Sequence, residues 1–298
     1  MQIILLYLAV VLIWGSTWIV IPFQLGEIAE ELSVSYRFGI AAVLLYGYAW
    51  LSGRQIALPR DAYRMVFIQG TMLFSLNYFL VYFGTAYITT GLIAVVFSSI
   101  VMFNAIFERV FFGSAFEARV LIAAAIGFTG IALIFWPEVT VLSFTDEAVI
   151  GISLVLLATI IASLGNMAAY VNTRHQLPVM AVNAHAMAWA AITSFLIALA
   201  LGRELNFSMQ TSYITSLLYL ALFGSAVAFG CYLALIRRIG AAKAAYSAVA
   251  FPIVALILST LFEGYTWTPA ALVGIILTLI GNWLILNQPA KKTTAIES

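Results

Sequence analysis

Long apolar stretches alternate along the chain with short polar breaks. Each stretch is close to the roughly 20 residues that a helix needs to cross about 30 Å of hydrocarbon. Ten such segments span residues 3–23, 33–51, 63–86, 89–107, 118–136, 148–171, 180–201, 212–235, 241–262 and 268–287. Glycine, proline and charged residues occupy the breaks, as at Ser52-Gly53-Arg54. The pattern predicts an all-α integral membrane protein with ten transmembrane helices.

Composition supports a lipid environment, because 64% of the 298 residues are apolar and 8% are charged. Soluble domains are about 45–50% apolar and about 25% charged. A net charge of +1 argues against a nucleic-acid partner. The single cysteine, Cys231, cannot form an internal disulfide, and no Cys/His cluster indicates a metal site. We therefore expect no cofactor and no bound metal.

The positions of Lys and Arg predict the orientation, since cytoplasmic loops are enriched in both. We interpret residues 3–23 as the first span and not as a signal peptide, because the segment is long and lacks a basic start. With both termini cytoplasmic, 11 of the 13 basic residues face inward. These are Arg54, Arg60, Arg64, Arg109, Arg119, Arg174, Arg237, Arg238, Lys243, Lys291 and Lys292. Arg37 and Arg203 are the exceptions, and the expected location is the cell inner membrane, crossed many times.

A weak internal repeat divides the chain. Leu51 to Arg54 recurs as Ala200 to Arg203, Ile106 to Glu108 as Leu261 to Glu263, and Ala123 to Gly130 as Gly274 to Gly281. Five spans per half is an odd number, so the second half must be inverted in the membrane. The predicted units are a five-helix repeat at 1–139, an inverted repeat at 148–287 and a short cytoplasmic tail at 288–298. Inverted repeats around a central cavity are typical of secondary transporters.

Several short motifs resemble the EamA-type branch of the drug/metabolite transporter superfamily. They are Ile13 to Trp18, Tyr36 to Gly39, Ala221 to Ser225, Arg238 to Ala245, and Pro252 in the ninth span. The resemblance covers residues 8 to 286 and implies an exporter of small metabolites with a cavity between two five-helix repeats. Phe97-Ser98-Ser99 stands where family members commonly carry a proline. We therefore expect a straighter fourth span.

Polar and aromatic side chains within spans are the candidates for a translocation path, because polar groups in lipid are costly unless they face helices or water. Several stand one helical turn apart and so share a face. The candidate substrate-binding residues are Trp14, Thr17, Trp18, Asn77, Tyr78, Tyr82, Ser99, Asn166, Tyr170, His185, Trp189, Lys243, Tyr246 and Ser247. If the halves are inverted, Asn166 and Tyr170 should face the pair Trp14 and Trp18.

Each candidate has a structural alternative. Tryptophan packs anywhere in a membrane protein, and Asn77 can hydrogen-bond a neighbouring helix. His185 can exchange protons near neutral pH or be simply hydrogen-bonded. Lys243 can meet a substrate carboxylate or extend to lipid phosphates. Arg37 has the same two readings, with a salt bridge to Glu30 or Glu31 as its structural alternative.

No Asp or Glu lies in the middle of a predicted span, since Glu108 and Glu263 stand at segment ends. Many proton-coupled carriers use a buried carboxylate as the proton site. Proton coupling through a carboxylate is therefore not the only possibility: facilitated diffusion and proton coupling through a histidine are alternatives.

The sequence favours a secondary transporter, not an enzyme, that exports amino acids or related small metabolites by alternating access. Its expected partners are a small-molecule substrate and the lipid bilayer, and we expect a monomer. A membrane enzyme would need paired carboxylates, histidine clusters or an activated nucleophile, and a channel would need a charged ring or filter loop. A carrier for other organic solutes, of drug or sugar type, is the nearer alternative.

Overall fold

Apolar runs of this length can satisfy their backbone polar groups in lipid only as helices. The computed structural model describes residues 2–24, 26–88, 90–114, 118–140, 146–262 and 267–286, and this part of the chain is helical without strands. The elements are α1 (Gln2–Val20), the 3-10 helix η1 (Ile21–Gln24), α2 (Glu30–Leu51), α3 (Ala62–Thr71), the π-helix η2 (Met72–Leu76), α4 (Asn77–Thr85), α5 (Thr90–Phe97), α6 (Ile100–Phe112), α7 (Ala118–Ile134), α8 (Trp136–Thr140), α9 (Asp146–Arg174), α10 (Val179–Ala200), α11 (Thr211–Tyr219), the π-helix η3 (Leu220–Val227), α12 (Ala228–Ile239), α13 (Ala241–Ala244), α14 (Ser247–Phe262) and α15 (Pro269–Leu286).

Seven helical stretches of the described chain are long and apolar enough to cross a membrane: 30–51, 62–84, 92–112, 146–174, 179–200, 211–239 and 241–262. Three shorter apolar helices, Gln2–Thr17, Ala118–Ile134 and Pro269–Ile285, coincide with the remaining predicted segments. The all-helical membrane class is confirmed. The number of crossings and the side on which the termini lie stay predictions.

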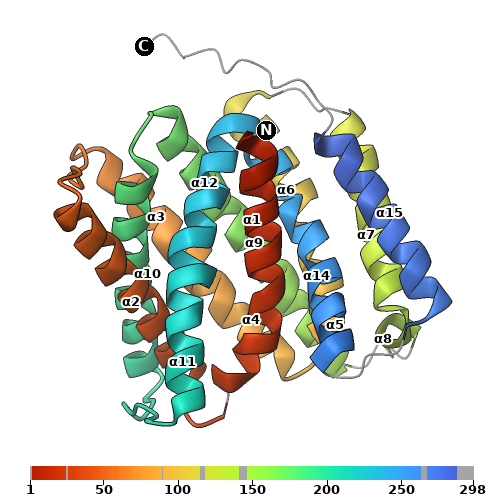
Figure 1. The fold of residues 1–298 in the computed structure, drawn as a ribbon, viewed down its shortest axis with the longest axis horizontal. Coiled ribbons are helices and arrows are strands. Elements are labelled where there is room, and N and C mark those ends of the chain that lie inside the picture. The colour runs from red at the N-terminus through yellow and green to blue at the C-terminus, as the bar shows by residue number, and fades with distance from the viewer. Residues whose placement is uncertain are drawn as a thin grey trace.

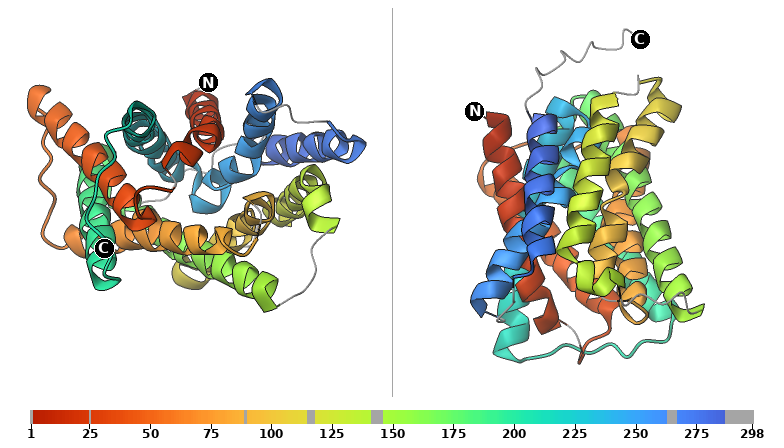
Figure 2. Two further views of the ribbon diagram at one scale, coloured as in Figure 1. Left: turned by 90° about the horizontal axis from the view of Figure 1, so that it is seen from below. Right: turned by 90° about the vertical axis from the view of Figure 1, so that its right-hand side faces the viewer.

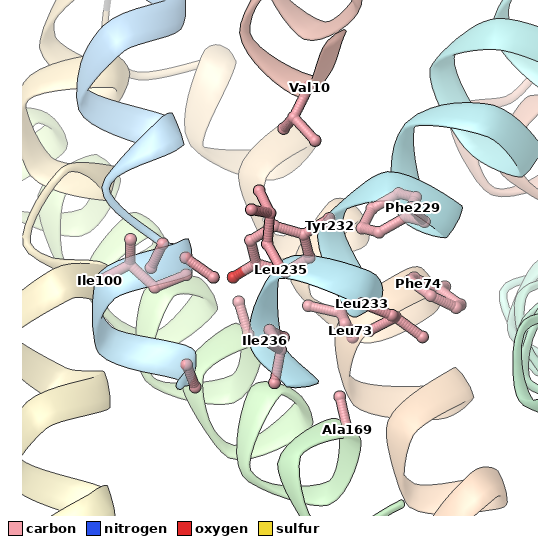
Figure 3. Close-up of a cluster of buried hydrophobic side chains, with 14 of the residues drawn as sticks. Val10, Leu73, Phe74, Ile100, Ala169, Phe229, Tyr232, Leu233, Leu235 and Ile236 are labelled. Carbon is pink, nitrogen blue, oxygen red and sulfur yellow. The ribbon is translucent and has the colours of Figure 1, made fainter. Parts of the chain in front are cut away.

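The helices stand side by side as a bundle (Figure 1). α7 packs along α15, α2 along α10, and α1 along both α12 and α14. On the other side of the bundle (Figure 2), α9 packs against α3, α4 and α6. Apolar side chains of α1, η2, α6, α9 and α12 meet between these groups, among them Val10, Leu73, Ile100, Ala169 and Leu233 (Figure 3). This buried core holds the candidate site residues at fixed positions.

The fourth span is interrupted at Ser98–Ser99, between α5 and α6, so the prediction of a straighter fourth span is wrong. Each serine Oγ donates to a carbonyl three residues earlier, of Val95 and of Val96, at 2.7 Å. Such bonds compete with the helical hydrogen-bond pattern, and the interruption occurs here without a proline. The ninth span breaks at residues 245–246, before Pro252, which lies inside α14.

The repeat motif at residues 51–54 and 200–203 is a helix cap in both places. Gly53 and Gly202 adopt φ of 63° and 66°, and the following amides of Arg54 and Arg203 each bond a carbonyl five residues earlier at 2.9 Å. This is the glycine-terminated Schellman arrangement. The two caps close α2 and α10, and the connections that follow them lie at opposite ends of the bundle (Figure 1).

Candidate functional site

Trp14 joins the first span to the eighth. Its Nε1 donates to the carbonyl oxygen of Gly224 at 3.2 Å, and its ring lies 4.9 Å from Phe229 and 5.1 Å from Tyr232 between centroids. Thr17 is buried and donates to the carbonyl of Trp14 at 2.7 Å, so its hydroxyl is used within α1. The side chain of Trp18 lies outside the described residues.

The contacts of Trp14 continue into a set of rings that we call the aromatic cluster. Its members are Trp14, Phe38, Phe74, Tyr78 and Phe229, and successive ring centroids are 4.5–5.5 Å apart. Four spans contribute to it: the first (α1), the second (α2), the third (η2 and α4) and the eighth (α12). The structure therefore brings together two predicted site residues, Trp14 and Tyr78, that are 64 positions apart in the sequence. Edge-to-face and stacked ring pairs of this kind bury a large apolar area with a defined geometry.

Asn77 and Tyr82 flank Tyr78 on α4. Asn77 is buried, and its Oδ1 has no hydrogen-bond partner among the described residues. Tyr82 borders a small cavity of about 10 Å³, which is room for about one water molecule. The lining residues are Glu30, Glu31, Val34, Ser75, Phe79, Tyr82, Ser194 and Ile197. This cavity lies between α2, η2–α4 and α10, where α2 begins.

A buried polar network forms around Asn104. Its Oδ1 accepts from Ser163 Oγ at 2.5 Å and from Asn166 Nδ2 at 3.4 Å, and its Nδ2 donates to the carbonyl of Ala241 at 3.2 Å. These bonds tie together α6, α9 and α13. The Oδ1 of Asn166 has no partner within the described part of the chain.

The expected apposition of Asn166 and Trp14 is indirect, because Tyr232 of α12 lies between them. The hydroxyl of Tyr232 adjoins Asn166, and its ring contacts Trp14. Tyr170, one turn after Asn166, instead packs against Phe112 at 5.0 Å.

His185 and Trp189 lie apart from the aromatic cluster. The Nε2 of His185 is 3.4 Å from the Tyr63 hydroxyl, its Nδ1 is 2.9 Å from the carbonyl of Ala181, and its ring contacts Tyr46. Trp189 packs edge-on against Phe67. Both side chains therefore contact residues of α2 or α3 at the side of the bundle.

The remaining candidates stand at the breaks of the fourth and ninth spans. Ser247 Oγ donates to Ala244 at 2.9 Å, and the Tyr246 hydroxyl donates to the carbonyl of Ala123 on α7. Lys243 is half-buried in α13. Ser99 bonds within its own span. Tyr246 and Ser247 therefore serve packing and helix geometry here, and neither contacts the aromatic cluster.

Arg37 is not among the predicted substrate-binding residues, although the rule for polar groups in spans applies to it as well. Its side chain is buried; Nε donates to Ser225 Oγ at 2.8 Å and Nη2 to the carbonyl of Gly224 at 3.3 Å. The salt bridge expected with Glu30 or Glu31 is not formed, because Glu31 pairs with Arg203 at 3.2 Å. Asn104 was also missed, though an amide within an apolar run is the signal that would have found it.

Comparison with known proteins identifies one family. The sequence model described as the EamA-like transporter family matches residues 1–136 and again 149–287. "Uncharacterized inner membrane transporter YedA" of Escherichia coli strain K12 is 28% identical over 289 residues, which covers 94% of this chain and 92% of the relative. "Protein PagO" of Salmonella typhimurium is 23% identical, covering 95% and 92%. A solved structure with 15% identity superposes with a TM-score of 0.79 over 94% of each chain, which shows the same fold.

Proposed function

Because the chain belongs to the EamA-like transporter family of the drug/metabolite transporter superfamily, we propose that it exports amino acids or related small metabolites by alternating access. Its place is the inner membrane, which it crosses several times. The printed name of YedA calls that protein a transporter, and neither its name nor that of PagO gives a substrate.

Two inverted five-helix repeats, at 1–139 and 148–287 with a tail at 288–298, are part of the proposal. The two segments that match the family model support this division. The packing of the helices supports it too: the second span packs on the seventh (α2 on α10) and the fifth on the tenth (α7 on α15). In an inverted repeat these pairs are the ones related by the pseudo-twofold axis.

The observation that carries the transport mechanism is the pairing of irregular helices. The third and eighth spans each contain a π-helix, η2 and η3, and the fourth and ninth spans are each broken. Interrupted helices near the bilayer midplane supply backbone groups for substrate in inverted-repeat carriers, and π-bulges occur frequently at functional sites. The aromatic cluster and Asn77 lie beside η2 and η3. We propose that substrate occupies a central cavity formed there when the halves move.

Counterflow in proteoliposomes tests this function. Vesicles that hold the purified protein and a high concentration of one unlabelled amino acid should accumulate the same amino acid, labelled, from outside. An imposed pH gradient then distinguishes proton-coupled from facilitated flux. If no amino acid moves while folded protein carries sugars alone, the proposal is wrong and the sugar-type carrier takes its place.

A further inference from the structure

Arg37 places a permanent positive charge within the bundle. It follows Glu30, the first residue of α2, by seven residues, which is about 10 Å along the helix axis. The residue is 5% exposed. A charged side chain at such a depth is costly; such residues pair with another charge or with backbone carbonyls, and they often mark a substrate path.

No acid neutralises Arg37 within the described part of the chain. Glu31, the acid nearest to Arg37 in the sequence of α2, forms a salt bridge with Arg203. The two hydrogen bonds of Arg37 go to a hydroxyl and a carbonyl, both neutral, while the rings of Phe38 and Tyr78 lie 5.4 Å from its guanidinium carbon. A guanidinium has five N–H donors, so these two bonds leave donor capacity for a ligand.

The eighth span fixes the orientation of the guanidinium. Gly224 lies in the π-helix η3, and its carbonyl accepts from both Trp14 and Arg37. A Cβ at this position would lie 3.0 Å from Thr17 Cγ2 and 3.2 Å from Arg37 Nη2, so a larger residue would shift one of these side chains by a few tenths of an ångström. Arg37 is thus aimed and preorganised, which is what binding of a flat two-oxygen group requires.

The surroundings of Arg37 suit an organic acid with an apolar body. Phe38 and Tyr78, which flank the guanidinium, belong to the aromatic cluster. Val34, one turn before Phe38 on α2, lines the cavity that Tyr82 also borders. The rings that flank the guanidinium would therefore contact the apolar body of a ligand whose carboxylate reaches Arg37.

We propose that Arg37 is the carboxylate-binding residue of this transporter, and that its substrates are carboxylate-bearing solutes with an apolar part. The assignment rests on the proposed transport function. A salt bridge or bidentate contact with a substrate carboxylate would supply the counter-charge that the protein itself does not provide.

The test compares L-leucine with isoamylamine, the same molecule without its carboxylate, and with 4-methylvalerate, which lacks the ammonium group. In wild-type proteoliposomes, unlabelled 4-methylvalerate should inhibit leucine counterflow and isoamylamine should not. In Arg37→Gln the half-saturation concentration for leucine should rise about 10- to 100-fold, the range expected for loss of a charge-assisted hydrogen bond. The maximal rate should change far less, and Arg37→Lys should restore part of the affinity.

Controls separate binding from folding. Arg54→Gln, at an exposed arginine in the connection after α2, should leave the half-saturation concentration near the wild-type value. If Arg37→Gln fails to fold, Ser225→Ala serves in its place, since it removes only the orienting hydroxyl, and an increase of about 3-fold is expected. If isoamylamine inhibits as strongly as 4-methylvalerate, the assignment of Arg37 is wrong, while the proposed transport function is unaffected. Wild-type protein that moves no amino acid overturns the proposed function and the assignment together.

Discussion

A tryptophan that hydrogen-bonds to the backbone of a neighbouring helix is fixed in orientation as well as in position. Trp14 is such a residue, with its indole N–H on Gly224 and its ring between Phe229 and Tyr232. The carbonyl of Gly224 belongs to the π-helix η3. Trp14 therefore packs within the aromatic cluster and also contributes a hydrogen bond to the irregular backbone of η3.

We predict that Trp14→Ala lowers leucine counterflow at least about 10-fold without loss of folded protein, because a large ring and its hydrogen bond are removed from the aromatic cluster. Trp14→Phe keeps the ring contact and should retain part of the flux. Trp50, which is 82% exposed on α2, gives the matched control Trp50→Ala, expected to behave as wild type. Normal flux in Trp14→Ala would remove the cluster from the transport path.

Tyr82 is predicted to contribute through the cavity that it borders. Tyr82→Ala should reduce flux several-fold, because the residue forms part of the lining of the cavity between α2, η2–α4 and α10. Tyr48→Ala, at a tyrosine 53% exposed on α2, is the control. The measurement is initial counterflow rate per folded protein; equal rates in the two variants would contradict the role of Tyr82.

At the scale of elements, glycines decide how closely α7 and α15 approach. A Cβ on Gly130 would lie 2.7 Å from the carbonyl oxygen of Gly274, and one on Gly274 would lie 2.5 Å from that of Gly130. The backbones thus touch at this pair. Small residues at helix contacts are the usual means of close packing in lipid, where apolar burial gives little driving force.

Gly274→Ala should therefore lower the midpoint of thermal unfolding in detergent, although alanine is intrinsically the better helix former. Gly47→Ala is the matched control, because a Cβ at Gly47 in α2 meets nothing within 4 Å. It should leave the midpoint unchanged or raise it slightly. A Gly274→Ala protein as stable as the Gly47→Ala protein would show that α7 and α15 can separate at no cost.

For the whole molecule, the two Schellman caps predict which loops share a side of the membrane. The connection after α2 lies at the end of the bundle where α1 begins, and the connection after α10 lies at the opposite end (Figure 1). If the termini are cytoplasmic, these connections face opposite compartments. Glu27 and Glu31 hold the second connection to the start of α2, through Ser208 at 2.7 Å and Arg203 at 3.2 Å.

Cysteine labelling checks this topology. Cys231 is the sole cysteine of the sequence, so Cys231→Ala gives a thiol-free background. In intact cells a membrane-impermeant maleimide should label Met209→Cys, at a residue 79% exposed, and should not label Ser52→Cys, which is also exposed. Both should react after the membrane is opened. Labelling of both positions in intact cells would contradict the inverted arrangement.

The sequence by itself determined the helical membrane class, the family and the apolar segments, because these follow from the hydropathy of each segment and from motifs within it. Helix ends such as those at Gly53 and Gly202 could also be predicted from the sequence, since a helix cap depends on neighbouring residues only. The break at Ser98–Ser99 is equally local, but the absence of a proline predicts a straighter helix there, because proline is the stronger sequence signal for a bend.

Only the tertiary structure decided which polar and aromatic side chains meet. Trp14 and Tyr78 share a cluster while His185 and Tyr246 stand apart from it, although all four lie in apolar segments. Arg37 and Glu31 are six residues apart on α2 but do not pair with each other: Arg37 bonds Ser225, and Glu31 bonds Arg203. The physical reason is that a side chain in lipid is satisfied by whatever neighbouring helix presents a partner, and helix contacts join residues far apart in the sequence.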